Sequence, residues 1–333
     1  MLWLAVETIR NAPRRILLAA VAVTFPVAVL SATLLFIDDS VHTMTTRALD
    51  PIQVEMRALA TSLDVDMTHV QRALSAVSGV REVDLFGAAD VIVGVPGVPD
   101  RITARLIAVG PSYLAHHGWV RAAGDPRNGA LLNGAVADTP GFADATSITI
   151  DLRGDVPPLG LSLPVAGRVD VRQATTWFAI PAGDVQGDLA IVPRAIVVDF
   201  ATFQRDILPA LQAAYGGPSA ATNPGLSELP PASLEAHVAV DHGAYPSDPG
   251  VAAIWSATTR RVLERQAPGD VLVADNTAEP LTEAATDATD AKVIFFLLGI
   301  PGALVAGALG LAAASALAEA HRRDDALLRL RGA

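Results

Sequence analysis

Two long apolar segments lie near the ends of this chain, and the residues between them are mostly polar. One covers residues 16–37 and the other residues 293–318, and neither contains a charged side chain. A helix needs about 20 apolar residues to cross the hydrocarbon core of a bilayer. The pattern therefore predicts two transmembrane helices that flank a large domain, residues 38–290.

The charged residues beside these segments predict their orientation. Basic residues lie outside the pair (Arg10, Arg14, Arg15, Arg322, Arg323, Arg329 and Arg331), whereas acidic residues lie between them (Asp38, Asp39, Asp287 and Asp290). Basic flanks remain on the cytoplasmic side of a membrane. We therefore expect a plasma-membrane protein with both termini in the cytoplasm and an extracytoplasmic central domain. A cleaved signal peptide is the alternative for the first segment, but its apolar core would span only about 7–15 residues.

Periodicity within the central domain predicts a mixed α+β fold in two subdomains. Expected strands are 52–57, one or two within 80–95, 102–109, 147–152, 165–171, 175–180, 196–198 and 271–273. Expected helices are 67–77 with Asp66 as its cap, 200–215 disturbed by Pro209, and 251–266. Residues 110–200 suggest a mostly β insertion, residues 216–233 a loop, and residues 38–49 and 276–291 helical stalks.

Two features concern the membrane segments themselves. Residues 1–15 predict a cytoplasmic amphipathic lead-in that contacts membrane lipid, although a frayed extension of the first span is the alternative. In the second span small residues recur every four positions, at Gly302, Ala306, Gly310 and Ala314. Such a row lets helices pack closely in lipid, so we expect a helix–helix contact there. The alternative is a chance row in a chain rich in alanine and glycine.

Composition excludes several functions. Residues 38–290 hold 31 acidic and 16 basic side chains, a net charge of −15, which does not suit nucleic acid. The chain has no cysteine, so it forms no disulfide and has no thiol ligand for a metal. Lys292 is the single lysine, and no phosphate-binding G-x-x-x-x-G-K-[ST] motif occurs. We therefore expect no bound cofactor, and any ATP would be bound by a partner.

Catalytic and metal-binding patterns are weak. Neither G-x-S-x-G nor H-E-x-x-H occurs, so we expect no enzyme and no catalytic residue. His116 and His117 are adjacent, and sequence neighbours rarely share one metal. His237, Asp241 and His242 are ligand types, but we expect them in a loop without ligand spacing. The sequence thus predicts no metal site.

The segment after the second span carries a specific resemblance. It is similar to the start of the FtsX-like domain of ABC transporter permeases, and eight residues match the pattern of that family: Arg322, Arg323, Ala326, Leu327, Leu328, Arg329, Gly332 and Ala333. The N-terminus, with Arg10, Asn11, Arg14 and Arg15, is similar too. Residues 74–80 resemble a helix-to-strand turn of MacB-like extracytoplasmic domains.

The resemblance implies a permease component that couples a separate cytoplasmic ABC ATPase to movement of the outer domain. Residues 319–333 would begin the FtsX-like domain, with contacts to the ATPase at Arg323, Leu327, Leu328, Arg329 and Gly332. Family members continue into further spans, so we expect a partial permease that needs those spans or a second copy, as a dimer. A two-span receptor or scaffold with an outer ligand-binding domain is the alternative, and a membrane-anchored enzyme is a third.

Overall fold

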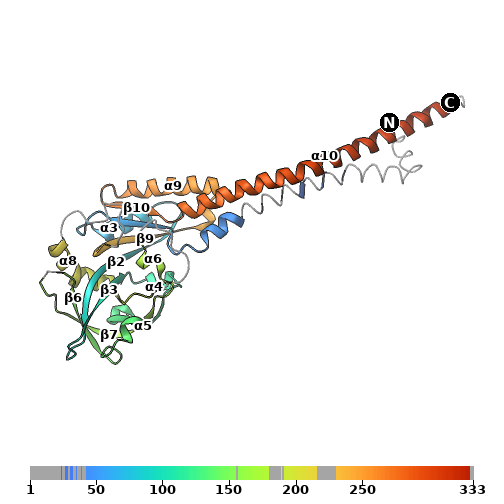
Figure 1. Ribbon diagram of the computed structural model, residues 1–333. Coiled ribbons are helices and arrows are strands. Elements are labelled where there is room, and N and C mark those ends of the chain that lie inside the picture. The colour runs from blue at the N-terminus through green and yellow to red at the C-terminus, as the bar shows by residue number, and fades with distance from the viewer. Residues whose placement is uncertain are drawn as a thin grey trace. The chain divides into compact units, whose positions relative to one another are not determined.

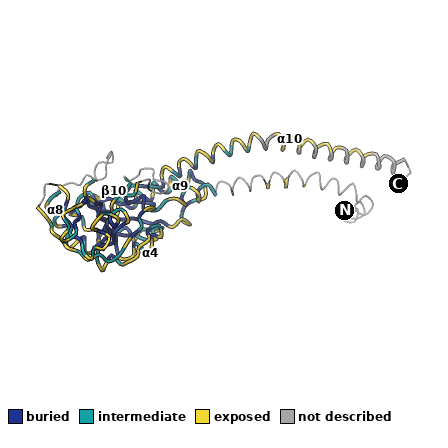
Figure 2. Tube along the Cα trace, turned by 60° about the horizontal axis from the view of Figure 1, so that its bottom comes forward, coloured by how far each residue is buried: buried dark blue, intermediate teal, exposed yellow. Residues whose placement is uncertain are grey.

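The computed structural model describes residues 43–154, 157–179, 191–215 and 230–330, together with Leu189 and single positions between 24 and 39. Contacts divide the chain into two units, and residues 45–283 form the larger one. All of the strands assigned in the described ranges lie within it (Figure 1). Figure 2 shows that buried residues gather inside this unit.

A single ten-stranded sheet forms the framework of the larger unit. Its strands are β1 (Met56–Ala60), β2 (Val80–Gly94), β3 (Arg101–Val109), β4 (Arg121–Ala123), β5 (Ala130–Asn133), β6 (Ser147–Leu152), β7 (Leu161–Asp170), β8 (Ala195–Asp199), β9 (Ala232–Val240) and β10 (Val271–Asp275). Their order is β10-β1-β9-β2-β3-β8-β5-β7-β4, and β6 pairs with β2 and β7. Only β3 with β8 and β5 with β7 pair in parallel among these strands. The two subdomains expected from the sequence thus share one sheet.

The central strands bury both of their faces. All nine residues of β9 are buried. Its even-numbered residues, such as Leu234 and Val238, join the larger core cluster, to which the helices α3 (Met67–Ser75) and α9 (Pro249–Gln266) also contribute. On the other face lies a second cluster around Phe86, with Tyr113 and Trp177. Polar residues of β9 at odd-numbered positions are therefore buried beside aromatic rings.

Local sequence explains the helices. The Asp66 carboxylate accepts hydrogen bonds from the backbone N–H groups of Thr68 and His69, so it caps α3 as predicted. Gly79 follows that helix with φ of +87°, which glycine adopts without strain. The remaining short helices on this unit are α4 (Tyr113–His116), α5 (Gly134–Ala137), α6 (Thr175–Phe178), α7 (Phe200–Thr202) and α8 (Leu208–Tyr215), with 3-10 turns at Pro126–Asn128 and His242–Ala244.

The predicted helix 200–215 is interrupted before Pro209. A π-helical stretch, Phe203–Ile207, separates α7 from α8. The N–H of Leu208 bonds to the carbonyl of Phe203, five residues back. Since proline has no N–H and crowds the preceding turn, a wider turn just before it accommodates the ring.

One long helix follows β10. It is α10 (Ala278–Leu330), and it contains the predicted stalk from residue 278 onward and the predicted second span. Within the described ranges, no helix satisfies both the length and the apolarity required for a membrane crossing. Most of the predicted first span, and all of residues 1–15, lie outside those ranges. Both spans therefore stay predictions.

Several sequence predictions of the domain were wrong in detail. The strand expected at 52–57 begins only at Met56. Residues 175–180 were expected as a strand, but α6 occupies Thr175–Phe178, because Trp177 packs into the second core cluster from a helical turn. Most of the expected loop 216–233 lies outside the described residues, and its last two positions belong to β9, which begins at Ala232. The mixed α+β class is confirmed.

Candidate functional site

Charged and polar residues form a row across three neighbouring strands. Arg57 of β1 pairs with His237 of β9, and His237 pairs in turn with Asp84 of β2. Cross-strand partners point to the same face of a sheet. These three side chains are all buried on that face, and they divide into two clusters with different surroundings.

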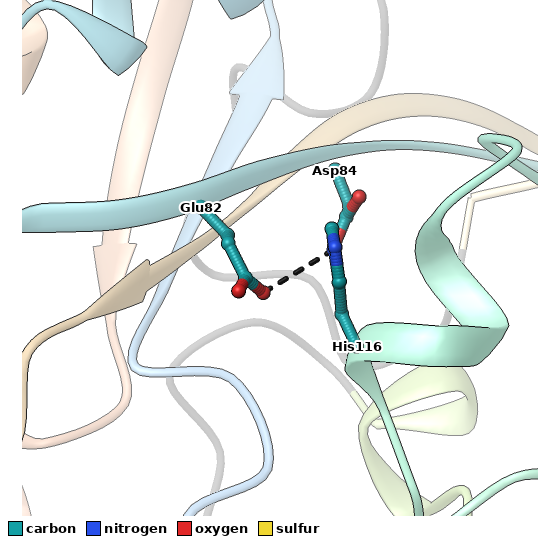
Figure 3. Close-up of side chains that lie close together, drawn as sticks. All are labelled: Glu82, Asp84 and His116. Atoms are coloured by element: carbon teal, nitrogen blue, oxygen red, sulfur yellow. Dashed lines mark hydrogen bonds and ion pairs between the residues drawn. The ribbon is translucent and has the colours of Figure 1, made fainter.

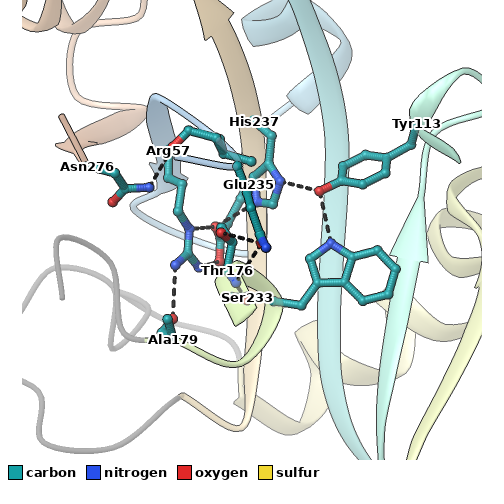
Figure 4. A network of polar contacts seen from close by, with 11 residues as sticks. Arg57, Tyr113, Thr176, Ala179, Ser233, Glu235, His237 and Asn276 are labelled. Atoms are coloured by element: carbon teal, nitrogen blue, oxygen red, sulfur yellow. Dashed lines mark hydrogen bonds and ion pairs between the residues drawn. The ribbon is translucent and has the colours of Figure 1, made fainter. Parts of the chain in front are cut away.

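The first cluster is closed, and we call it the Arg57 cluster: Arg57, Tyr113, Trp177, Glu235 and His237. Arg57 donates two parallel hydrogen bonds to the Glu235 carboxylate, at 2.7 and 2.9 Å, and a third to the carbonyl of Ala179 at 2.9 Å (Figure 4). Ion pairs of this forked geometry are the strong ones. Both charges are therefore satisfied although they are almost completely buried.

The aromatic half of this cluster fixes the proton positions. Trp177 donates its indole N–H to the Tyr113 hydroxyl at 2.9 Å, and that hydroxyl lies 2.6 Å from His237 Nδ1. Nε2 of His237 lies 3.3 Å from Glu235. Each bond has a proton if Tyr113 donates to Nδ1 and the opposite nitrogen, Nε2, donates to the carboxylate. His237 is then neutral, with its proton on Nε2.

Electrostatics agrees with this assignment. Burial lowers the pKa of His237 to about 4, despite the neighbouring Glu235 carboxylate. Burial alone would raise the pKa of Glu235, but the charge of Arg57 and the hydrogen bonds from His237 and Arg57 hold it well below its ordinary value. Burial raises the pKa of Tyr113. At neutral pH the cluster therefore contains one ion pair and uncharged His237 and Tyr113.

The second cluster is more open, and we call it the Asp84 cluster: Glu82, Asp84, His116 and His117. Nδ1 of His116 lies 2.8 Å from Asp84 Oδ2 and 3.2 Å from Glu82 Oε2 (Figure 3). Nε2 of His117 lies 3.3 Å from the same Asp84 oxygen. The two carboxylates project from β2, whereas the histidines come from the end of α4 and the residue after it.

Two features distinguish the Asp84 cluster electrostatically. Burial alone would raise the pKa of Asp84, but its contacts with His117, His116 and Ser112 outweigh burial and hold this pKa below its ordinary value. His117 is buried, yet its Nε2 makes no hydrogen bond. The 3.3 Å contact of this nitrogen with Asp84 is therefore not a well-aligned hydrogen bond, and a buried polar atom that is incompletely bonded costs free energy.

A pocket of about 480 Å³ opens beside the Asp84 cluster. Besides His116 and His117, its lining includes His242 and Glu55, which pair at 2.7 Å. The hydrogen bond to Glu55 raises the pKa of His242. The rest of the lining is Asp50, Pro51, Ile52, Gln53, Arg81, Trp119, Gln173 and Ala239. Imidazole and carboxylate groups thus meet in a space that a small solute or ion can enter.

The structure does not bring the histidines and aspartate of residues 237–242 together as one site. His237 lies in the middle of β9, bonded within the Arg57 cluster. Asp241 caps the turn after β9 by accepting from the N–H of Gly243. The imidazole of His242 is hydrogen-bonded to the carboxylate of Glu55. The expectation that this stretch is a loop was wrong for His237, because the buried polar residues of β9 resemble an exposed pattern.

The residues predicted for coupling and packing lie mostly beyond what can be described. The side chains of Arg323, Leu327, Leu328 and Arg329, and all of Gly332, lie outside the described residues, as do the side chains of Ala306 and Ala314. Gly302 has open space around it and Gly310 is partly buried. These roles stay predictions.

Little in the sequence indicates the two clusters. Glu82 and Asp84 are far in the chain from His116 and His117, and only the fold joins them. The alternation of polar Ser233, Glu235 and His237 with apolar residues was the available signal for β9. Without knowledge that both faces are buried, that alternation could not locate an internal ion pair.

No protein-family model matches the chain, and no curated protein matches it. Solved structures are similar in part. The periplasmic region of MacB from Actinobacillus actinomycetemcomitans is 11% identical, with a TM-score of 0.41, over 70% of this chain and 94% of that one. The extracellular domain of the noncanonic ABC-type transporter YknZ from Gram-positive bacteria is 8% identical, with a TM-score of 0.36, over 66% and 98%. Because both scores are low, the case for a function depends on this chain's own residues.

Proposed function

We propose that this protein is a permease component of an ABC transport system, in which a separate cytoplasmic ATPase moves an extracytoplasmic domain. The sequence resemblance of residues 322–333 to FtsX-like permeases motivates the proposal. The structural observation that carries it is the place where the chain enters and leaves the compact unit. Those two points lie side by side. The helical segments that reach them, residues 43–49 before β1 and α10 after β10, are called the leads below, and both could continue into one membrane.

The adjacent leads follow from the sheet. β1 is the first strand and β10 the last, and they pair antiparallel with Met56 opposite Asp275. Asn276 then binds back across this junction, through its N–H to the carbonyl of Glu55 and through its side chain to the carbonyl of Val54. The start of β1 and the end of β10 are therefore joined by several hydrogen bonds.

Both leads are also fixed in the core. Leu49, at the end of the helical segment before β1, is 2% exposed, and Leu281, in the first turn of α10, is fully buried. Both belong to the larger core cluster. A displacement of either lead would therefore act directly on the edge strands of the sheet, which suits a domain that responds to movement in the membrane.

The continuity of α10 supports the coupling role. A single helix runs from Ala278, directly after β10, to Leu330 in the predicted cytoplasmic segment. Helices transmit displacement along their axes because backbone hydrogen bonds hold successive turns together, and α10 continues through Pro301, which cannot donate such a bond. ATP-driven movement at residues 319–333 would reach the domain by this route. The alternative remains a two-span receptor or scaffold that uses the same helix to report ligand binding.

Topology can be tested directly because the chain has no cysteine. A single cysteine at exposed His69 (His69→Cys) should react with a membrane-impermeant maleimide on intact cells. Ala333→Cys should react only after the cells are opened. Labelling of residue 333 on intact cells, or protection of residue 69, would overturn the proposed arrangement.

Coupling needs a separate test. Leu328→Asp places a charge in the predicted contact and should reduce co-purification of the ATPase subunit at least tenfold, whereas Leu328→Met should leave it near the wild-type level. Retention of the ATPase by Leu328→Asp would argue against this contact. If the topology holds and no ATPase co-purifies with the wild-type chain, the receptor or scaffold interpretation is the better one.

A further inference from the structure

We propose that Glu82, Asp84, His116 and His117 bind a divalent transition-metal ion, with Zn²⁺ as the best match. Three of these residues, Glu82, Asp84 and His116, place one ligand atom each within 4.8 Å of the others. His117 lies beside this group, with its Nε2 3.3 Å from Asp84 Oδ2, and would complete the site as a fourth ligand once its side chain moves toward the ion. This site is independent of the proposed membrane role.

The distances fit a tetrahedral ion. Zinc binds nitrogen and carboxylate oxygen at about 2.0–2.1 Å, so neighbouring ligand atoms of a tetrahedral site are roughly 3.3 Å apart. The three contacts among the candidate ligand atoms measure 2.8, 3.2 and 3.3 Å. These three pairs therefore have the spacing of neighbouring ligands, and the remaining pairs would close around the ion on binding.

The buried nitrogen of His117, which lies close to a carboxylate without a well-aligned hydrogen bond among the described residues, points independently to a ligand. The side chain of His117 is 7% exposed, and its Nε2 makes no hydrogen bond although it faces the Asp84 carboxylate. The ring is held in place by neighbouring aromatic rings, with centroids 4.2 Å from Tyr113 and 5.2 Å from Trp119. A metal ion between this nitrogen and the Asp84 carboxylate would give the nitrogen a directional bond.

The carboxylate of Asp84 is oriented for the same purpose. Ser112 donates its hydroxyl to Oδ1 of Asp84 at 2.9 Å. The other carboxylate oxygen of Asp84, Oδ2, faces both histidines. Hydrogen bonds of this kind from a neighbouring residue fix ligand geometry in metal sites. The orientation of Asp84 thus does not depend on the two imidazoles.

Adjacent histidines can share one ion here because the chain turns between them. His116 is the last residue of α4, and His117, with φ of −108° and ψ of 84°, is no longer helical. One ring presents Nδ1 and the other Nε2 to Asp84. The expectation that sequence neighbours would not share a metal assumed a regular element through both residues.

Ligand chemistry selects the class of ion. Two imidazoles favour zinc and other late first-row divalent metals over Mg²⁺ and Ca²⁺, which prefer oxygen ligands. Two carboxylates and two neutral imidazoles also balance the charge of a divalent cation. His116 and His117 line the pocket of about 480 Å³, which provides a route for the ion. Binding would lock α4 to β2.

The test uses the full-length chain in detergent, without a polyhistidine tag and after treatment with a chelator. Zn²⁺ is titrated in competition with a chromophoric chelator, and Co²⁺ is added separately to record its visible spectrum. We expect one Zn²⁺ per chain, a rise in the thermal unfolding midpoint on binding, and the intense absorption of four-coordinate Co²⁺.

The variants His116→Asn and Glu82→Gln should weaken Zn²⁺ binding at least tenfold. Both side chains are about one-third exposed, at 31% and 29%, so the fold should tolerate their replacement. His69→Asn, on the exposed side of α3, and His242→Asn, in the other pair beside the pocket, are the matched controls and should bind as the wild type does. The proposal is overturned if the wild-type chain binds no Zn²⁺ at micromolar concentration, or if His116→Asn binds it unchanged.

Discussion

The Arg57 cluster and the Asp84 cluster both combine a carboxylate with histidine on neighbouring strands, yet they have opposite properties. In the first, the ion pair and the His237–Tyr113–Trp177 chain give each charged or ring group a hydrogen-bonding partner. In the second, His116 and Glu82 are partly exposed, and His117 Nε2 is buried without a hydrogen bond. Satisfied bonding indicates a structural role, and incomplete hydrogen bonding at His117 indicates a site that can accept a ligand.

The difference also shows how a sheet can bury charge. Arg57 and Glu235 are almost completely buried, so their cost of desolvation is offset by their mutual geometry and by the hydrogen bonds to Ala179 and His237. Asp84 is equally buried, but its partners His116 and His117 line a pocket. Removing one partner should therefore have very different consequences in the two clusters.

The largest effect is expected for Glu235→Gln. It leaves the Arg57 guanidinium charged, buried and unpaired, which typically costs about 3–5 kcal/mol. Thermal or urea unfolding of the chain should show this loss. The double variant Arg57→Met/Glu235→Leu removes both charges and should be more stable than Glu235→Gln. If Glu235→Gln unfolds at the wild-type midpoint, the Arg57 cluster has no structural importance.

An intermediate effect is expected from pH. The pKa of His237 is lowered to about 4 in the folded protein, and that of an unfolded histidine is about 6.5. Between these values the unfolded state binds the extra proton, so stability should fall as pH decreases from about 6.5 to about 4, by on the order of 1–3 kcal/mol.

Unfolding midpoints measured across this pH range, with a chelator present to remove metals, test the prediction, and His237→Gln should flatten the profile. His242 acts with the opposite sign, because its pKa is raised by Glu55. Its contribution is present at low pH and is lost as pH rises through the folded pKa. That loss falls above about pH 6.5, so His242→Gln should lower stability at acid pH without changing the slope between about 6.5 and 4. A wild-type profile that is flat between these pH values contradicts the neutral state assigned to His237.

The smallest effect is expected for Glu82→Gln in the presence of a chelator. Glu82 is partly exposed, and partly exposed pairs contribute about 0–1 kcal/mol. Its unfolding midpoint should therefore nearly match that of the wild type when no metal is present, and should differ once Zn²⁺ is added. A large loss in chelator would place Glu82 among the structural residues and would remove the contrast between the two clusters.

Sequence alone predicted the elements whose signals are local. Asp66 and the apolar positions Val70 and Leu74 located α3, and simple alternation located β6. It failed for β9, where polar residues are buried. The glutamate and histidine of that strand suggested a solvent-exposed segment. The Asp84 cluster could not be predicted, because a long-range contact joins β2 to the end of α4.

The junction of β1 and β10 has a mechanical consequence. The chain enters at Met56 and leaves at Asp275, which are partners at the same end of an antiparallel ladder. Forces that pulled these two ends apart would peel β10 from β1 one residue pair at a time, rather than load all the hydrogen bonds together in shear. Strands that are separated one residue pair at a time resist the pulling force only weakly. The domain therefore tolerates leads that move in the same direction, and it yields first at its outermost strand when they diverge.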